Sequence, residues 1–454
     1  MAGGIQLQWP GREWKTSDRA RDNANSGQST EIVDVTGSGA HRLVHGDVLD
    51  LTNALGSGNF RGKVDLVYVD PPYASDRDYV AESRLDGPAD GRVVRTPAYA
   101  DTWTSKAGGL GAYLEMLAPR LEALVDLLGP KGTIWVHLDW RAAYLIRAIL
   151  DEIMGRDAFL NEIVWRRAPN LGRQATSGQF GRTLDTLVVY GKKDATLTPP
   201  TRLEPIEEGA IRRDEKNRPF TSAPRGDYTD ASIARLDAEG RVHRTASGRV
   251  YIKYFLVKNE EGVWCRERRV DALWTDVPPL RHAAASERTG YPTQKPRALL
   301  ERIIRCATEP GGLVVDAFAG SGTTGVAAHA LGRRAVLGDR SPVAIATARN
   351  RMLRAGAGLT IERAQGAVAP PTASTPLKIS TTKTSIVLDE PAEPLAWALG
   401  EVKNGAFRAL WHAERAPGAK AIAAARKAPI SPRASTMVRV WGDDGSITTA
   451  RVSP

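Results

Sequence analysis

The sequence predicts an α/β fold on a mostly parallel, twisted sheet with one antiparallel hairpin at its edge. Short apolar runs, typical of strands buried on both faces, occur at 64–69, 132–138, 186–190, 313–316 and 334–339. Apolar residues at helical spacing alternate with them, as at 110–128 and 298–307. Strands that alternate with amphipathic helices are the pattern of parallel sheets.

The composition narrows the class of protein. The 454 residues are 42% hydrophobic and 25% charged, as in globular proteins. We find no apolar run of membrane-spanning length and no signal peptide, so we expect a cytoplasmic protein without membrane contact. Cys265 and Cys306 are the two cysteines, which disfavours a disulfide scaffold and a cysteine-based zinc site, and we expect no metal. The net charge of +10 suits a polyanionic partner.

The strand at 64–69 ends on Asp70-Pro71-Pro72-Tyr73. The prolines cannot donate to a sheet ladder, so the strand stops there and the loop is stiff. The loop presents a carboxylate, free carbonyls and an aromatic ring at the carboxyl end of a strand, where ligands bind in open α/β sheets. These groups suit a flat ring with an exocyclic amine, because Tyr73 can stack on the ring while Asp70 and the Pro71 carbonyl accept the amine's protons. A surface turn is the alternative.

A second strand, 313–316, leads into the glycine-rich turn Asp316–Thr324 and then a helix, which places backbone amides near a ligand. A phosphate loop is disfavoured because no Gly-Lys-Ser/Thr follows, and a dinucleotide site would need a wider glycine spacing. The next strand ends on Asp339, in a position suited to ribose hydroxyls. An ordinary βαβ unit with a tight turn is the alternative.

The order of these motifs resembles the β-class of DNA amino-methyltransferases, in which the catalytic half precedes the half that binds S-adenosylmethionine. Over residues 40–355, Asp-Pro-Pro-Tyr is followed by a long insert, Tyr291-Pro-Thr-Gln-Lys-Pro296, the glycine turn and Asp339. The chain looks most like site-specific DNA methyltransferases related to type III modification subunits, although the family usually has His where Tyr291 stands. The resemblance implies a Rossmann-like methyltransferase fold with a target-recognition insert and a small C-terminal α+β appendix.

The resemblance also implies roles for individual residues. Asp70, Pro71, Pro72 and Tyr73 would form the catalytic loop, with Tyr73 stacked on a flipped base. The residues implied at the cofactor are Asp47, Thr293, Lys295, Pro296, Asp316, Phe318, Ala319, Gly320, Ser321, Gly322, Thr323, Thr324 and Asp339. Asp47 would bind the cofactor's adenine amine, and an N-cap of the helix at 48–55 is an equally good and compatible interpretation.

The polar segment 74–105 is too long for a simple connector, so we predict a loop over the active site. Tyr79, Tyr99 and Trp103 are candidate stacking residues there, although packing is the more common role. Four arginines before the strand at 186–190 suit contacts with the DNA backbone, or a solvated basic loop: Arg166, Arg167, Arg173 and Arg182. We interpret His137, at a strand end, as structural.

We divide the chain into a flexible N-terminal arm (1–38), the catalytic half (39–191), the target-recognition insert (192–288), the cofactor half (289–365), a linker (366–386) and a small C-terminal domain (387–454). The insert contains hairpin-like pieces such as 241–254. Residues 166–288 hold 23 Lys and Arg against 17 Asp and Glu, an excess that suits phosphate contacts or a charged accessory subdomain. The C-terminal domain shows helical patterning at 395–399 and 407–413 and a hairpin signal at 442–445.

From this resemblance we expect methyl transfer from S-adenosylmethionine to N6 of adenine in double-stranded DNA, with the target base flipped out. In the family, Asp as the first residue of the catalytic motif leans towards adenine and Ser towards cytosine. N4 of cytosine is therefore the first alternative, followed by an RNA substrate or a catalytically silent DNA-binding subunit. The resemblance also makes a homodimer and a restriction-system partner candidates.

Overall fold

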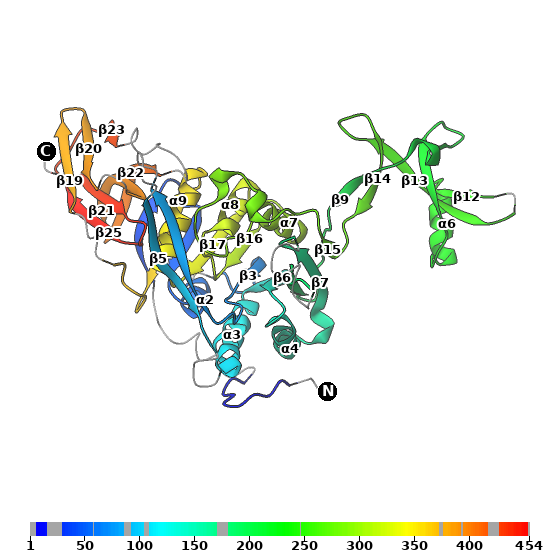
Figure 1. The fold of residues 1–454 in the computed structure, drawn as a ribbon, viewed down its shortest axis with the longest axis horizontal. Helices are drawn as coiled ribbons and strands as arrows, with labels where there is room; N and C mark the ends of the chain where they lie inside the picture. Colours follow the sequence, from blue (N-terminus) through cyan, green and yellow to red (C-terminus); the bar gives the residue numbers. More distant parts are fainter. Residues whose placement is uncertain are drawn as a thin grey trace. The chain divides into compact units, whose positions relative to one another are not determined.

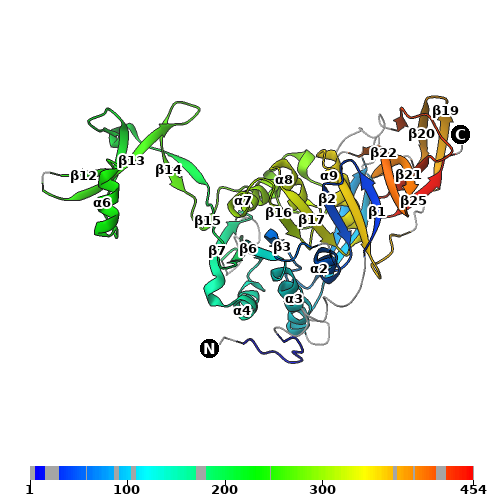
Figure 2. The same cartoon turned by 180° about the vertical axis from the view of Figure 1, so that it is seen from behind.

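The structure is a computed structural model that describes residues 6–15, 30–57, 59–85, 92–103, 109–169, 180–245, 247–371, 376–391, 394–415 and 426–452. The chain forms two compact units. The large unit comprises Met1–Thr198 and Ala272–Pro454, and the small unit is Pro199–Asp271. Figures 1 and 2 show the elements of both units from opposite sides.

Fourteen strands of the described residues form one sheet in the large unit (Figure 1). Its centre is parallel and consists, in spatial order, of β6 (Leu128–Leu138), β3 (Val64–Val69), β16 (Leu313–Asp316), β17 (Arg334–Asp339), β2 (His41–His45) and β18 (Leu359–Ala364). Every residue of β16 is buried, as expected of a strand covered on both faces. The mostly parallel α/β sheet predicted from the sequence is therefore confirmed.

Antiparallel strands flank the parallel centre on both sides. β8 (Leu184–Gly191) is antiparallel to β6 and to β7 (Phe159–Arg166), and β15 (Leu273–Trp274) continues beyond β7. This is the antiparallel hairpin expected near one edge. On the other side, β1 (Thr30–Thr36) pairs antiparallel with β18 and parallel with β22 (Ala406–Glu414).

Two groups of helices cover the two faces of the parallel strands, as the ribbon shows from both sides (Figures 1 and 2). One group contains α2 (Val48–Ser57), α3 (Gly109–Val125) and α4 (Ala143–Met154); the other contains α7 (Arg297–Ala307), α8 (Thr323–Ala330) and α9 (Pro342–Arg354). In α7 the buried residues Leu299, Leu300, Ile303 and Ile304 follow helical spacing, so one stripe of the helix faces the sheet. Short 3₁₀ turns lie at Arg156–Ala158, Leu280–His282 and Ala285–Glu287.

The C-terminal region continues the main sheet through β22, β21 (Ala396–Lys403), β24 (Met437–Trp441) and β25 (Ile447–Arg451). The helices expected at 395–399 and 407–413 are wrong, because these residues form β21 and β22. Alternate residues of β21 enter two hydrophobic clusters, Trp397 and Leu399 in one and Ala396 and Ala398 in the other. A strand buried on both faces is a continuous apolar run, which periodicity cannot distinguish from a helix.

A three-stranded sheet of β19 (Lys378–Thr382), β20 (Ser385–Glu390) and β23 (Lys427–Ala428) accompanies these strands. The linker predicted at 366–386 is therefore wrong where β19 and the start of β20 lie, since Ser and Thr suit exposed strands as well as linkers. The hairpin predicted around 442–445 is confirmed by the antiparallel pairing of β24 with β25. The described C-terminal residues form strands, so the helical part of the expected α+β appendix is a further error.

The flexible arm predicted for 1–38 is wrong for its described residues. Trp14 is fully buried, and its indole Nε1 donates to Glu122 Oε2 at 3.0 Å. Trp9 stacks on Trp14 with ring centroids 6.5 Å apart, and β1 belongs to the main sheet. Trp9, Trp14 and Leu7 pack on the core, which buries enough apolar surface to fix a segment that is otherwise largely polar.

The loop predicted for 74–105 is an antiparallel ribbon of β4 (Arg77–Leu85) and β5 (Arg92–Asp101). Tyr79 and Tyr99 are a cross-strand pair with stacked rings 4.7 Å apart. The prediction failed because the ribbon carries many charged residues, and a two-stranded ribbon has little apolar alternation to reveal it.

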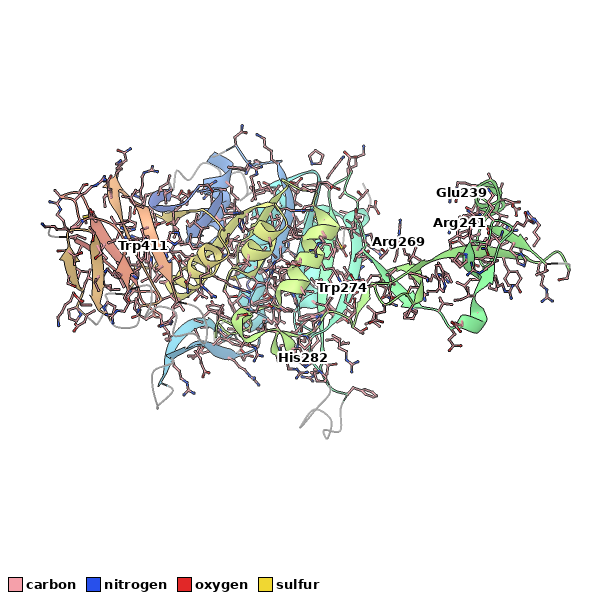
Figure 3. The ribbon with its side chains drawn as sticks, turned by 90° about the horizontal axis from the view of Figure 1, so that it is seen from above. Glu239, Arg241, Arg269, Trp274, His282 and Trp411 are labelled. Carbon is pink, nitrogen blue, oxygen red and sulfur yellow. The ribbon has the colours of Figure 1, made fainter. Side chains whose placement is uncertain are left out.

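The small unit is a sheet of short strands with one helix. Its elements are β9 (Thr201–Pro205), β10 (Arg212–Arg213), β11 (Pro219–Pro224), α6 (Asp230–Ala238), β12 (Val242–Arg244), β13 (Val250–Lys258), β14 (Trp264–Arg269) and a 3₁₀ turn at Glu208–Ala210. The predicted hairpin at 241–254 is confirmed by the pairing of β12 with β13. Glu239 and Arg241 lie beside one another after α6 (Figure 3), with Oε2 and Nη1 3.6 Å apart.

Among the described helices, none combines the length and the hydropathy that a membrane-spanning segment requires.

Candidate active site

The central strands bring five aspartates to one edge of the sheet. Asp316 and Asp339 end β16 and β17, while Asp47, Asp70 and Asp139 follow β2, β3 and β6. Parallel strands have their carboxyl ends on the same edge, so residues far apart in sequence meet there. A cleft at this edge, called the strand-end cleft, is lined by most of the predicted site residues: Asp47, Asp70, Pro71, Pro72, Tyr73, Thr293, Lys295, Asp316, Phe318, Ala319, Gly320, Ser321, Thr323, Thr324 and Asp339.

Asp70 makes an ion pair inside the cleft. Lys295 Nζ lies 2.5 Å from Asp70 Oδ2 and 2.7 Å from Oδ1, and the Tyr73 hydroxyl donates to Oδ1 at 2.7 Å. The Lys295 ammonium is also 5.1 Å from the centroid of the Tyr73 ring, within cation–π range. Burial, followed by the charge of Asp70, raises the pKa of Tyr73 well above its ordinary value, so Tyr73 is a neutral hydrogen-bond donor.

Asp101, at the end of β5, fixes the loop that follows Asp70. Its Oδ2 accepts the backbone N–H groups of Tyr73 at 3.1 Å and Ser75 at 2.8 Å, and its Oδ1 accepts that of Ala74 at 3.0 Å. The Ser75 hydroxyl and the Trp103 indole donate to the same carboxylate at 2.7 and 2.8 Å. Asp101 is 1% exposed, so one buried carboxylate sets the backbone that carries the Tyr73 ring.

A chain of buried polar groups lies next to the Tyr73 ring. The Tyr68 hydroxyl is 2.9 Å from His137 Nδ1, and His137 Nε2 is 3.2 Å from Asp185 Oδ2. Arg167 Nε donates to the other oxygen of Asp185 at 2.7 Å. Although burial opposes it, the hydrogen bond and charge of His137 lower the pKa of Asp185. The ring centroids of Tyr73 and His137 are 6.1 Å apart, so this chain supports the ring from within the core.

A second cavity, called the Tyr73 cavity, adjoins the strand-end cleft. The residues that line only this second cavity include Asp139, Arg141, Trp165, Arg167, Asp185 and Arg281. Five residues line both spaces: Tyr73, Tyr79, Thr293, Gln294 and Lys295. The Tyr73 loop and the segment 291–296 therefore stand between two adjoining spaces.

The glycine-rich turn closes the far side of the strand-end cleft. Asp316 is fully buried; its Oδ2 accepts the Thr324 hydroxyl at 2.5 Å and its Oδ1 accepts the Phe318 N–H at 3.0 Å. Burial raises the pKa of Asp316 to about 7, despite these hydrogen bonds. Gly322 begins α8 with φ of 74°, a left-handed conformation that favours glycine. A Cβ on Gly322 would lie 2.8 Å from the Cβ of Ala348, so the turn packs tightly on α9.

Two further aspartates flank the turn. Asp339 Oδ2 accepts the Gly320 N–H at 2.9 Å, and burial raises its pKa, against the hydrogen bonds that it accepts. Asp47 accepts Arg120 Nε and Nη2, both at 2.9 Å, in a bidentate pair. Its Oδ1 also accepts the Leu49 N–H at 3.2 Å, which is a cap at the start of α2. Asp47 thus caps the helix and also faces the cleft.

Some predicted residues lie outside the cleft. Gly322 packs beneath it, and Pro296 lines the Tyr73 cavity and caps α7. Of the four arginines, Arg167 lines the Tyr73 cavity and Arg182 lies 4.0 Å from the centroid of the Trp140 ring. Arg166 is exposed beyond both spaces, and Arg173 is outside the described residues. Their proposed contacts with DNA stay a prediction.

Sequence reasoning missed Asp101 and Asp185. Asp101 lies in a segment interpreted as a loop, where a carboxylate carries no visible pattern. Asp185 directly precedes the strand predicted at 186–190, and its pairing with His137 depends on the antiparallel register of β8 on β6. No three His, Cys, Asp or Glu side chains gather as metal ligands would in the part of the chain that the structure describes.

The fold and the two adjoining spaces define an α/β protein of the Rossmann-like type whose ligands meet at the carboxyl edge of the sheet. The chain belongs to the N6/N4 DNA methylase family, whose model matches residues 64–350.

Three relatives illustrate the similarity. The type II methyltransferase M.EcaI of Enterobacter cloacae is 28% identical over 316 residues, 64% of either chain. The StyLTI Mod subunit of a type III restriction-modification enzyme of Salmonella typhimurium is 25% identical over 383 residues, 73% of this chain and 56% of its own. The DNA adenine methyltransferase YhdJ of Escherichia coli is 42% identical over 91 residues, 20% of this chain and 30% of its own. The chain therefore spans less than two thirds of the length of each relative.

Proposed function

We propose that this protein transfers the methyl group of S-adenosylmethionine to N6 of adenine in double-stranded DNA, with the target base flipped out of the duplex. The observation that carries the proposal is the pair of adjoining spaces that share Tyr73 and Lys295. A methyl donor in the strand-end cleft and a flat base in the Tyr73 cavity would meet at Tyr73 and Lys295, beside Asp70, which lines the cleft and pairs with Lys295. Membership of the DNA methylase family supports the same reaction.

The residues of the strand-end cleft suit the proposed methyl donor, which is a cation with ribose hydroxyls and an adenine ring. Asp316 and Asp339 offer carboxylate oxygens at the strand ends, and Asp47 offers another at the opposite wall. Gly320 is also left-handed, and a Cβ there would lie 3.1 Å from the Tyr291 ring, so the turn is shaped for close approach of its backbone. When bound, S-adenosylmethionine supplies the electrophilic methyl group.

The chain's own groups would orient the amine. Tyr73 stacks on the base, while Asp70 and the Pro71 carbonyl accept the two protons of the amine and direct its lone pair towards the methyl group. Asp101 holds the backbone of Tyr73 and Ser75, so the stacking ring is in place before the base arrives. Lys295 has to release one oxygen of Asp70 for the amine, and solvent takes the proton that the methylated amine loses.

Adenine is the proposed base for two reasons. The first residue of the catalytic motif is Asp70, which in the family leans towards adenine. The relative YhdJ is described as a DNA adenine methyltransferase. The family also includes N4-cytosine enzymes, so the product has to be identified rather than assumed.

The test is a methylation assay with purified full-length protein, labelled S-adenosylmethionine and mixed-sequence duplex DNA, followed by mass spectrometry of the nucleosides. We expect N6-methyladenine with the wild type and none with Asp70→Ala. N4-methylcytosine would overturn the choice of base and keep the mechanism. Label in a parallel reaction with RNA but none in DNA, or the same product from Asp70→Ala, would contradict the proposal.

We also propose that the protein acts as a homodimer alongside a restriction partner. Similarity to a type III Mod subunit supports the proposal of a restriction partner. Light scattering after size exclusion should give twice the chain mass of 49.1 kDa. A single-chain mass at working concentration would contradict the dimer, and the assay above tests whether a partner is needed for activity.

A further inference from the structure

A third cavity of about 220 Å³ lies in the large unit, where the C-terminal strands meet β1, β18 and α9. It is separate from the two spaces at the candidate active site. Its charged and titratable lining consists of Glu31, Asp34, His45, Arg349, Arg363 and Arg439. We call it the arginine cavity, because its three arginines come from three different elements, α9, β18 and β24. Its volume is several times the share of one water molecule, about 30 Å³.

Arg349 is the most unusual residue of the arginine cavity. Its side chain is 1% exposed, and none of its three guanidinium nitrogens has a hydrogen-bond partner among the described residues. The nearest carboxylate oxygen in an ion pair, Glu414 Oε1, is 3.8 Å from Nη1. The guanidinium carbon lies 3.4 Å from the centroid of the Trp441 ring. This cation–π contact restrains the guanidinium without using its N–H groups, which arginine can donate to oxyanions.

Other polar atoms of the cavity lack partners in the same way. Arg363 Nε, His45 Nε2 and Asp34 Oδ2 are buried without a hydrogen-bond partner within the described part of the chain. Asp34 Oδ2 lies 3.6 Å from Arg439 Nη1, so these two charges largely offset one another. Glu414 lies near Arg349 and Glu31 is exposed, so the cavity is distinguished by its unpaired N–H donors and not by a net charge.

Several unpaired buried polar atoms around one space are rare in folded proteins, because each costs free energy unless a partner is present. Donors from separate elements suit a tetrahedral oxyanion better than a planar carboxylate, since Arg349 and Arg363 can approach from different directions, while Arg439 already donates to Thr449 and to the Val33 carbonyl. Burial, followed by the charge of Arg363, lowers the pKa of His45, so its ring is neutral and Nε2 can accept a proton from a protonated oxygen.

We propose that the arginine cavity binds a small phosphate-class oxyanion, either inorganic phosphate or a phosphomonoester, through Arg349 and Arg363. The site is independent of the proposed methyl transfer, because none of its lining residues lines the strand-end cleft or the Tyr73 cavity. Residues next to the cavity's lining do line the strand-end cleft. His45 lies two residues before Asp47, and Pro342 lies shortly after Asp339 and Arg340. A bound anion would therefore stabilise the junction between the C-terminal strands and the elements that carry the strand-end cleft.

The experiment measures binding to the full-length protein without S-adenosylmethionine. Inorganic phosphate and adenosine monophosphate are titrated in separate arms by calorimetry and by thermal unfolding, against sodium chloride at equal ionic strength. The chloride arm controls for general screening of a chain with a net charge of +10. We expect saturable binding and a melting temperature that rises with the logarithm of anion concentration. Tighter binding of the monophosphate would identify a phosphomonoester, and equal or weaker binding would identify inorganic phosphate.

Arg349→Met removes the donors at similar volume, and Arg363→Gln removes a charge at a partly exposed position, so it tests the site if the first variant does not fold. Arg354→Gln is the matched control, because Arg354 is exposed on the same helix. We expect both cavity variants to weaken anion binding by about tenfold or more and the control to leave it unchanged. The proposal is overturned if neither anion exceeds chloride, or if all variants respond as the wild type does.

Discussion

Lys295 Nζ lies between both carboxylate oxygens of Asp70, at 2.5 and 2.7 Å, in a pair whose side chains are only 10% and 16% exposed. The two residues are 225 positions apart and come from the two motifs that flank the long insert. In the free protein, Lys295 occupies the acceptors that the proposed mechanism assigns to the amine. The pair therefore compensates a nearly buried carboxylate, and in the proposed mechanism a base would displace the ammonium.

We predict that Lys295→Met lowers the free energy of unfolding by about 1–3 kcal/mol, because it leaves the Asp70 carboxylate without its cation. Combining it with Asp70→Asn should recover most of this loss, since the uncompensated charge is then absent. Chemical denaturation of the four proteins gives the coupling free energy directly. Lys131→Met, at an exposed position of β6, is the control and should be near neutral. Additive effects of the two substitutions would refute the idea that the ion pair is energetically important.

Asp101 should act as a positioning residue for methyl transfer. Asp101→Asn keeps the shape of the side chain but replaces one acceptor oxygen by an N–H group that faces the donors of Tyr73, Ala74 and Ser75. The loop has to shift, and we expect kcat to fall by roughly 100-fold. The Kd for S-adenosylmethionine should change much less than kcat, because Asp101 acts through the backbone of the Tyr73 loop, although its side chain also lines the strand-end cleft.

The matched control is Asp78→Asn, on the partner strand of the same ribbon, where the carboxylate is exposed and accepts one hydroxyl. Its kcat should be close to that of the wild type. Equal losses for the two variants, or a loss confined to cofactor affinity, would show that Asp101 only stabilises the ribbon.

The raised pKa of Asp316 gives a prediction for stability against pH. Burial moves this pKa from 3.8 to about 7, so the folded protein binds the proton more tightly than the unfolded chain. The stabilisation that the folded protein gains from this tighter proton binding is fully present below about pH 4 and is lost as pH rises through about 7. Relative to Asp316→Asn, the wild-type free energy of unfolding should fall in this window by up to about 1.4 kcal/mol per pH unit. Denaturation of both proteins between pH 4 and 8 tests this, and parallel curves would contradict it.

The parts of this protein that were predictable from sequence share a local signal. The strands that end at Val69 and Asp316 are short apolar runs, and they stop at prolines or at a glycine turn. Nearby residues therefore determine both that these segments are strands and where they end. Once the sheet is parallel, the meeting of these ends follows from topology. For this reason most of the predicted cleft residues lie together although they are hundreds of positions apart.

The errors occur where structure depends on distant partners. β21 is apolar on both faces because each face meets a different cluster, and the ribbon of β4 and β5 shows little periodicity of its own. Trp14 is buried by α3, which lies about a hundred positions away along the chain. The role of Asp101 requires the ribbon to return to the Tyr73 loop, and a sequence without this topology does not reveal it.

The last prediction concerns the turn that begins α8. Gly322 combines a left-handed φ of 74° with a Cβ position only 2.8 Å from the Cβ of Ala348. Gly332 has a similar φ of 69°, but a Cβ there would meet nothing within 4 Å. Gly332→Ala should therefore cost only the conformational strain, about 1 kcal/mol, while Gly322→Ala should cost that amount and the clash with α9.

Because α8 carries the turn that forms one wall of the strand-end cleft, Gly322→Ala should also weaken S-adenosylmethionine binding by about tenfold or more, and Gly332→Ala should not. Thermal unfolding and calorimetric titration of the two variants measure both effects on the same samples. Equal destabilisation would mean that α9 yields to the added methyl group. Unchanged cofactor affinity in Gly322→Ala would separate the turn from the binding of the methyl donor.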